Sequence, residues 1–240
     1  MRMQRLAATL VGLAFAAGGA SAQTVNTTDR GWVNQLGFHQ PSNTNYFVGT
    51  LIGGEDGDVF RNFFVFDVPT IGGGGDYTAA LLRLFSDTAF VGIPETFSVW
   101  SVESNIDSLI AGTGGPQSFE DLADGSLLGT ATIETGSDRW IDVELNTAGV
   151  AAVNARKGQR IALGGTLTNN SQLPTSYAFG YTGSTDPADG DTKLVLRTTG
   201  GTNGGGTTGG DPVPEPGEWA AMGILGTTLA MLVVRRRRAA

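Results

Sequence analysis

The chain contains no cysteine and a single histidine, His39, among its 240 residues. The absence of cysteine excludes disulfide bonds, zinc–thiolate sites and thiol catalysis together. Without covalent cross-links, the fold has to be held by its core. No serine–acid pair accompanies His39 in "GFHQPSNTNY". We therefore interpret His39 as a structural hydrogen-bonding residue and expect neither a histidine triad nor a histidine metal cluster.

Basic residues are scarce in the central part of the chain. Of the 15 Lys and Arg residues, two lie in the first five positions and four in 235–238, which leaves nine in 23–212. That segment holds 21 of the 23 acidic residues, so its net charge is −12. Such a surface repels phosphate backbones, and we expect no nucleic-acid partner. The same charge favours the solubility of an exported protein.

The N-terminus, "MRMQRLAATLVGLAFAAGGASAQT", has the three parts of a secretory signal peptide in order. Arg2 and Arg5 form a positive region, and a short apolar stretch over 6–17 follows it. Ala20, Ser21 and Ala22 then form a small-residue cleavage site. The pattern predicts a signal peptide over 1–22, removed by signal peptidase so that the mature chain starts near Gln23.

A second apolar segment, 217–234, precedes a run of four arginines near the C-terminus. As a helix, its 18 residues would reach roughly 27 Å, enough for the hydrocarbon core of a membrane. Trp219 lies at the end where an indole favours the headgroups. Clustered arginine resists translocation, so the segment predicts a single transmembrane helix with the body outside the inner membrane. The stop-transfer residues are Arg235, Arg236, Arg237 and Arg238.

The order of these features resembles the PEP-CTERM sorting signal. The resemblance covers about the last 28 residues, 213–240, and begins with the motif Val213, Pro214, Glu215 and Pro216. It implies export by a Gram-negative bacterium that makes exopolysaccharide, and processing by an exosortase-type membrane protease. It also implies an inner-membrane precursor with its body in the periplasm, then delivery to the cell surface or extracellular matrix.

The residues themselves fit a motif that a protease reads. Pro214 and Pro216 lack backbone donors and bias their neighbours toward extended geometry, which keeps the motif out of a helix. Upstream, "TTGGTNGGGTTGGDP" over 198–212 cannot bury a core and predicts a flexible linker. Such a linker would separate the folded body from the membrane.

The body, 23–197, follows a period of two residues. In "RWIDVELN" over 139–146, alternate residues are apolar, which places Trp140 on the polar face. "TAALLRLF" over 78–85 alternates too, while "RNFFVFDV" over 61–68 is apolar on both faces and indicates a central strand. Only "TAGVAAVNARKG", 147–158, predicts a helix, and 104–126 is expected to be a long loop. Eight or more short strands predict an all-β antiparallel sandwich, of jelly-roll type. The other expected strands are "ETFSVWSV", "QRIALGG", "SYAFGY" and "KLVLRT".

The order of these segments resembles the DNRLRE-type domains of bacterial exoproteins. The segments that carry the resemblance are "NTNYFVG", "RNFFVFDVP", "AALLRLF", "FSVWSV", "WIDVELNTAGVAAVNARKGQRIALGG" and "KLVLRT". It implies a β-sandwich related to carbohydrate-binding modules. It also implies a binding or structural module and no catalysis.

Two acidic loops are candidate calcium sites. Calcium takes several hard oxygen ligands, which clustered carboxylates on glycine-bearing loops supply. Neither loop matches an EF-hand, and Asp and Gly also favour ordinary solvated turns. The turn remains the alternative, and we expect the body to be stable without metal. The loop residues are Asp186, Asp189 and Asp191 in the second loop and Glu55, Asp56 and Asp58 in the first.

Exposed aromatic rings are the candidate ligand platform, because sugars stack on them. Most aromatic residues of a domain this size belong to its core. Trp140 is the first choice because it alternates with Asp142 and Glu144. The other candidates are Trp32, Trp100, Tyr46, Tyr177 and Tyr181.

Three classes of function follow. The first is a structural or adhesive protein of the envelope or exopolysaccharide matrix, and the second is a carbohydrate-binding module for a defined glycan. The third, a glycan-active enzyme, lacks support because no motif isolates one carboxylate pair among the many acids. We therefore expect no catalytic residues and no cofactor other than calcium.

The sorting motif and the membrane span should separate by mutation. Replacing Pro214, Glu215 and Pro216 with alanine leaves the 217–234 span intact, so the variant should stay in the inner membrane as a larger, unprocessed species. Deleting 235–238 should instead let the tail slip or invert, because the stop-transfer charge is gone. Membrane fractionation and mass spectrometry of the mature C-terminus measure both outcomes. Normal processing of the alanine variant would reduce the motif to a linker.

Overall fold

A computed structural model of the chain describes residues 21–51, 58–168, 173–180 and 190–199. All of them belong to one compact unit, Met1–Asn203. Most of the predicted signal peptide, most of the linker and the whole sorting tail lie outside the described residues, and so does the predicted span over 217–234. No helix among the described residues is long and apolar enough to cross a membrane.

Strands dominate the described residues, and every strand pair is antiparallel, which confirms the all-β prediction. Eleven strands are present in this part of the chain. Their bounds are β1 Ser21–Asn26, β2 Asp29–Asn34, β3 Val48–Leu51, β4 Asp58–Asp67, β5 Tyr77–Phe90, β6 Glu95–Ser101, β7 Leu127–Ile133, β8 Gly136–Glu144, β9 Arg160–Leu167, β10 Ser176–Gly180 and β11 Thr192–Thr198.

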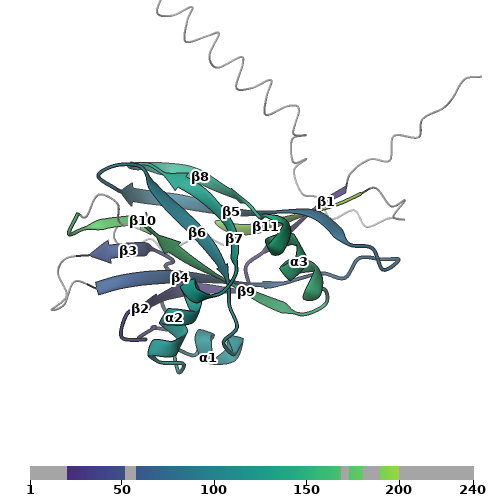
Figure 1. Ribbon diagram of the computed structural model, residues 1–240, viewed down its shortest axis with the longest axis horizontal. Helices are drawn as coiled ribbons and strands as arrows, with labels where there is room; N and C mark the ends of the chain where they lie inside the picture. The colour runs from purple at the N-terminus through teal and green to yellow at the C-terminus, as the bar shows by residue number, and fades with distance from the viewer. Residues whose placement is uncertain (1–20, 52–57, 169–172, 181–189, 200–240) are drawn as a thin grey trace, which may run out of the picture. The chain divides into compact units, whose positions relative to one another are not determined.

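The strand order is β1-β11-β5-β10-β3-β4-β9-β6-β7, with β2 beside β4 and β8 beside β5. The order contains two groups: β1, β11, β5 and β8, and β2, β4, β9, β6 and β7. Strands β10 and β3 link the groups. In Figure 1, β8, β5 and β11 lie along the upper side of the body and β4, β2 and β9 along the lower side.

The main core takes apolar side chains from both groups of strands, as the alternation predicts. In β8, Ile141 and Val143 are buried while Trp140 is exposed. In β5, Leu82 and Leu84 are fully buried while their neighbours are only half-buried. Each strand therefore puts one face into the core. The core cluster includes Val48, Phe64, Phe66, Leu82, Leu84, Phe97, Val99, Ile133, Val143, Leu163, Phe179, Leu194 and Leu196.

Strand β4 is apolar on both faces because it lies between two clusters. Phe64 and Phe66 belong to the main core, whereas Phe63 and Val65 belong to a second, smaller cluster. The second cluster packs helix residues such as Leu122 against β4 and β9. The prediction that "RNFFVFDV" forms a central strand is confirmed, since β4 pairs with β2, β3 and β9.

The prediction of a single helix is wrong, because the described residues contain three. Helix α3, Thr147–Ala155, lies within the predicted range. Helices α1, Ile106–Ile110, and α2, Pro116–Asp124, replace most of the loop expected over 104–126. They are short, and two residues of α2, Phe119 and Leu122, supply most of its apolar contact with the sheet. In α2, Phe119 and Leu122 recur at helical spacing after Pro116 at the helix start, so the sequence held a helical signal that the prediction missed.

The two ends of the body are neighbours. Strand β1 pairs with the last strand, β11, and the register places Ser21 opposite Thr198. The predicted cleavage point between Ala22 and Gln23 falls inside β1. Cleavage there would leave Gln23 to Asn26 paired with Leu196 to Lys193, so a mature chain keeps most of this edge strand.

His39 lies in the core, as a structural residue would. It is 4% exposed, its Nδ1 lies 2.8 Å from the Trp32 carbonyl, and its ring meets Phe63 edge-on. A carbonyl only accepts, so Nδ1 carries the proton and donates it. Burial lowers the pKa of His39, an effect that the Trp32 hydrogen bond, the charge of Asp29 and the Ile110 carbonyl oppose. Folding therefore holds the ring in its neutral form.

The stability of the fold should decrease as the pH falls through about 6.5, the ordinary pKa of histidine. Below that value the unfolded chain binds a proton more readily than the folded chain, and the effect levels off once the folded ring is also protonated. Urea unfolding between about pH 7.5 and about pH 5.5 measures it.

The variant His39→Gln should lose most of this dependence. Burial raises the pKa of Asp29, so this carboxyl works in the opposite direction and cannot produce the same slope. An unchanged slope in His39→Gln would assign the pH dependence to another group.

Candidate functional site

Two of the aromatic candidates are buried and cannot serve as ligand platforms. Tyr46 is fully buried, and its hydroxyl donates to the Phe85 carbonyl over 2.7 Å. Trp32 is 9% exposed and packs edge-on against Phe60 at 5.2 Å. Both predictions are wrong. Tyr46 packs against Phe64 and Phe179 of distant strands, and Trp32 packs against rings of the loops around it and of β4, which local alternation does not reveal.

Two further candidates are half-buried, and one lies outside the described residues. The indole of Trp100, on β6, donates to Thr166 Oγ1 over 2.9 Å. Tyr177, on β10, lies opposite Phe90, with ring centroids 6.3 Å apart. Tyr181 lies outside the described part of the chain.

Trp140 lies where the sequence predicts it, on the outer face of β8, and it is 38% exposed. The register pairs it with Phe85 of β5, and the two rings meet edge-on at 5.4 Å. None of the three helices lies over the middle of this face: α1 and α2 lie on the far side of the body, and α3 lies at one end (Figure 1). We name the outer side chains of β5, β8 and β11 around this ring the Trp140 face.

Two cations approach the Trp140 ring from the same side. The ammonium of Lys193, on β11, lies 5.0 Å from the ring centroid, and the guanidinium carbon of Arg83, on β5, lies 5.2 Å from it. Strand β5 lies between β8 and β11, so both cations reach the ring from the β5 side. At these distances the ring quadrupole attracts a cation by about 0.5–1 kcal/mol at an exposed site.

Strand register aligns the charges of the Trp140 face in a row. Lys193 is opposite Arg83, and Arg83 is opposite Asp142. The Arg83 Nε lies 3.3 Å from Asp142 Oδ1. Burial raises the pKa of Asp142, Arg83 lowers it, and Glu144 raises it again.

A carboxyl with a raised pKa is typical of a general acid, but this one is held in an ion pair. It also lies on a sheet face beside an aromatic ring.

The calcium candidates fall mostly outside the described residues. This is true of Asp186 and Asp189, and also of Glu55 and Asp56; the side chain of Asp58 is not described either. Asp191 begins the turn before β11, and its carbonyl accepts from Phe85 N over 2.8 Å. Within the described ranges, no group of three or more His, Asp or Glu side chains is arranged to hold a metal ion. The calcium site therefore remains a prediction.

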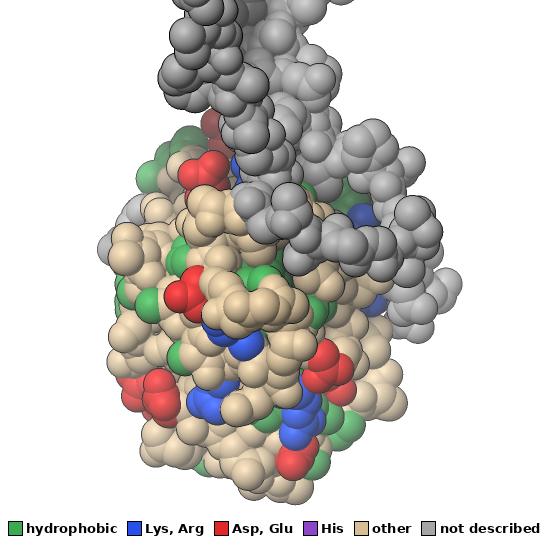
Figure 2. Space-filling view, turned by 90° about the vertical axis from the view of Figure 1, so that its right-hand side faces the viewer, with side chains coloured by type: hydrophobic (Ala, Val, Ile, Leu, Met, Phe, Trp, Pro, Cys, Tyr) green, Lys and Arg blue, Asp and Glu red, His purple; other side chains and the backbone are tan. Residues whose placement is uncertain are grey.

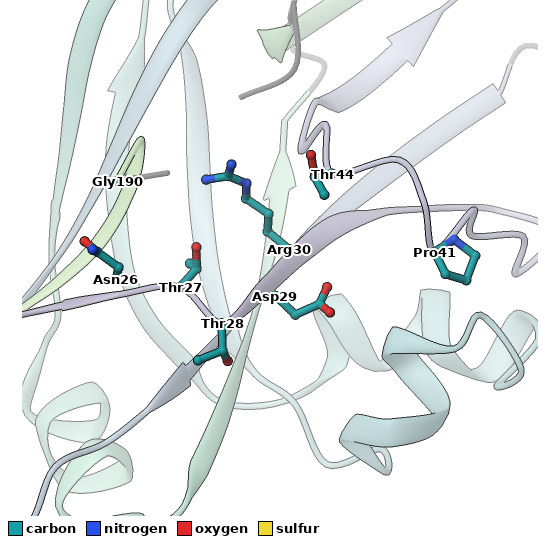
Figure 3. A pocket seen from close by; sticks show the side chains of 8 residues that line it. All are labelled: Asn26, Thr27, Thr28, Asp29, Arg30, Pro41, Thr44 and Gly190. Carbon is teal, nitrogen blue, oxygen red and sulfur yellow. The ribbon is translucent and has the colours of Figure 1, made fainter. Parts of the chain in front are cut away.

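A polar cavity of about 400 Å³ lies where the chain passes from β1 to β2. Figure 3 shows that its two charged side chains, Asp29 and Arg30, leave the strand in different directions. Arg30 is 7% exposed and donates to Thr192 Oγ1 over 3.0 Å, with the Tyr46 ring 5.4 Å away. The charged groups do not converge on a common ligand position. The lining residues are Asn26, Thr27, Thr28, Asp29, Arg30, Pro41, Thr44 and Gly190.

The end of the body that carries α3 has charges of both signs. Figure 2 shows acidic and basic side chains interspersed on it, with no large patch of one sign among the coloured atoms. Ion pairs explain part of this pattern. Lys157 contacts Asp76, and Arg160 Nη2 lies 2.6 Å from Asp107 Oδ1. Exposed pairs of this kind contribute little to stability.

Sequence reasoning missed an exposed apolar turn after β2. Leu36 and Phe38 are 67% and 55% exposed, and Asn34 Oδ1 accepts from both of their backbone N–H groups at 3.1 and 2.9 Å. Gly37 between them has φ +80°, and a Cβ there would lie 2.0 Å from the backbone of Gly115. The available signal was an apolar pair flanking a glycine in a turn.

The chain matches no protein-family model and no curated protein. The resemblances to the PEP-CTERM signal and to DNRLRE-type domains therefore remain predictions.

Metal removal should leave the body folded. Excess EDTA is expected to leave the melting temperature of the purified protein unchanged, because the main core is built from apolar side chains. Thermal unfolding with EDTA, and again with added calcium, measures this. A clear loss of melting temperature in EDTA that calcium reverses would instead favour the loop containing Asp186, Asp189 and Asp191 as a calcium site.

Proposed function

We propose that the chain is an exported, non-catalytic adhesive protein of a bacterial cell envelope or exopolysaccharide matrix. In this proposal the body adheres to polysaccharide through the Trp140 face. The single observation that carries the proposal is a Trp140 ring that is 38% exposed on a sheet face that no described helix covers. A large aromatic ring on a rigid strand is preorganised for stacking, since little entropy is lost when a ligand binds.

The fold belongs to the same proposal. We interpret the two groups of strands around one core as a sandwich of jelly-roll type, with β10 and β3 closing it. Jelly-roll sandwiches include lectin domains. Helices α1 and α2 cover the outer face of β4 and β9, which leaves the face of β5, β8 and β11 for a partner.

Export and sorting complete the proposal. The signal peptide over 1–22 directs secretion, and the 217–234 span with its arginines holds the precursor in the inner membrane. An exosortase-type protease reads Pro214, Glu215 and Pro216. Because β1 and β11 are neighbours, both chain ends would leave the body at the same place.

The alternatives differ in what the Trp140 face does. A carbohydrate-binding module would bind one defined glycan on it, whereas a purely structural protein would bind none. A glycan-active enzyme is the remote alternative. Asp142 and Glu144 share this face, but Asp142 is ion-paired with Arg83, which argues against its use as a proton donor.

Binding of the purified protein to a glycan array tests the proposal. We expect binding to polysaccharide, and we expect Trp140→Ala to weaken it by at least about tenfold, as loss of a central aromatic contact does. Binding to several related glycans would indicate general adhesion, whereas binding to a single glycan would indicate a defined carbohydrate-binding module.

Phe38→Ala is the matched control, because it also removes an exposed ring, but from the turn after β2. It should leave binding unchanged, and circular dichroism should show both variants folded. If Trp140→Ala bound like the unmodified protein, the Trp140 face would not be the ligand platform.

A further inference from the structure

The cations beside Trp140 point to the class of polysaccharide that the face recognises. We propose that the Trp140 face selects acidic saccharides, with a sugar ring stacked on Trp140 and its carboxylate bound by Lys193. The inference rests on the proposed function, since it names the ligand class for that same surface. Such binding requires an aromatic ring and an accessible cation that are close enough for one sugar residue to contact both.

Lys193 is the cation beside the Trp140 ring that has no carboxylate partner among the described residues. Its ammonium lies 5.0 Å from the Trp140 centroid, and it forms no ion pair with any residue in the described part of the chain. The basic residues Arg61, Arg83, Lys157 and Arg160 are all in ion pairs there. An ammonium next to a ring and without a carboxylate partner can take a ligand carboxylate as a charge-assisted hydrogen bond, about twice as strong as a neutral one.

The neighbouring residues extend the same preference. Arg83 adds a second positive charge 5.2 Å from the ring, although Asp142 shares it. Arg197, two alternate positions along β11 from Lys193, faces the same way and forms no ion pair with a described residue. Successive sugars of a polymer that crosses β8 and β11 would therefore meet more than one cation.

The net negative charge of the body does not exclude an acidic polymer. At physiological ionic strength, charges separated by more than about 8 Å are largely screened. The local cations therefore decide the contact. A polyuronate carries one charge per sugar, a much lower charge density than a nucleic-acid duplex, which has one charge per about 1.7 Å. Repulsion is correspondingly weaker.

The test compares polygalacturonate with its carboxyl-reduced derivative, which has the same sugar backbone without charge. With the purified protein at about 0.15 M salt, polygalacturonate should bind roughly tenfold more tightly. Lys193→Gln should remove most of that difference and leave the affinity for the reduced polymer unchanged. Lys193→Arg should retain the preference, because it keeps the charge. Trp140→Ala should weaken both polymers.

Lys157→Gln is the matched control, since Lys157 is ion-paired with Asp76 at the α3 end and should not affect either polymer. Equal affinity for the two polymers, or an equal loss for both in Lys193→Gln, would overturn the acidic-saccharide inference. Binding of neutral array glycans without any binding of polygalacturonate would overturn this inference alone. Absence of binding to every glycan would overturn the proposed function as well.

Discussion

The fold depends on burying one face of β5 between β8 and β11. Leu82 and Leu84 point into the main core, so their neighbours Arg83 and Phe85 have to point outward. Pairing with β8 then fixes Trp140 opposite Phe85, because side chains alternate with a period of two. A slip of one residue would bury Trp140 and expose Val143, which the apolar core does not permit. The same alternation that buries Leu82 and Leu84 in the core thus places the side chains of the candidate ligand surface on the outside.

The two outer faces of the body differ in whether helices cover them. On the side of β4 and β9, a second apolar cluster fills the space under α1 and α2. The carboxylate of Asp121 holds the start of that helical segment, since it accepts from the backbone N–H groups of Glu103 and Ser104 at 2.6–3.0 Å. On the side of β5, β8 and β11, the outward residues include Arg83, Trp140 and Lys193 as well as the aliphatic Leu81 and Val195, and no described helix lies over the middle of this side (Figure 1). The described helices therefore cover one outer side of the body and leave the other without a helix over its middle.

Charge on the open face is arranged by pairs across strands. Asp142 lies beside Arg83, whereas Lys193 has the Trp140 ring as its neighbour and no carboxylate among the described residues. An ion pair and a cation–π contact at a half-exposed surface each change the free energy of folding by only about 1 kcal/mol or less. Two of the few basic residues of the acidic body, Arg83 and Lys193, thus lie beside one aromatic ring.

Much of the fold could be predicted from local pattern. Alternation predicted the strands that became β5 and β8 and the outward position of Trp140, and the doubly apolar run predicted β4 as central. The lone histidine was interpreted as a structural hydrogen-bonding residue, and its Nδ1 does bond the Trp32 carbonyl. These features depend only on neighbours along the chain. Helices α1 and α2 were not predicted, although α2 has apolar residues at helical spacing after Pro116; only the tertiary structure shows that these residues pack on β4 and β9. The burial of Tyr46 likewise depends on Phe64 and Phe179, which distant strands bring to it, and that of Trp32 depends on how the following loops fold back on its ring. The meeting of Lys193, Arg83 and Trp140 was also decided by tertiary structure alone: the three residues are far apart in sequence, and only the order β11-β5-β8 brings them to one surface.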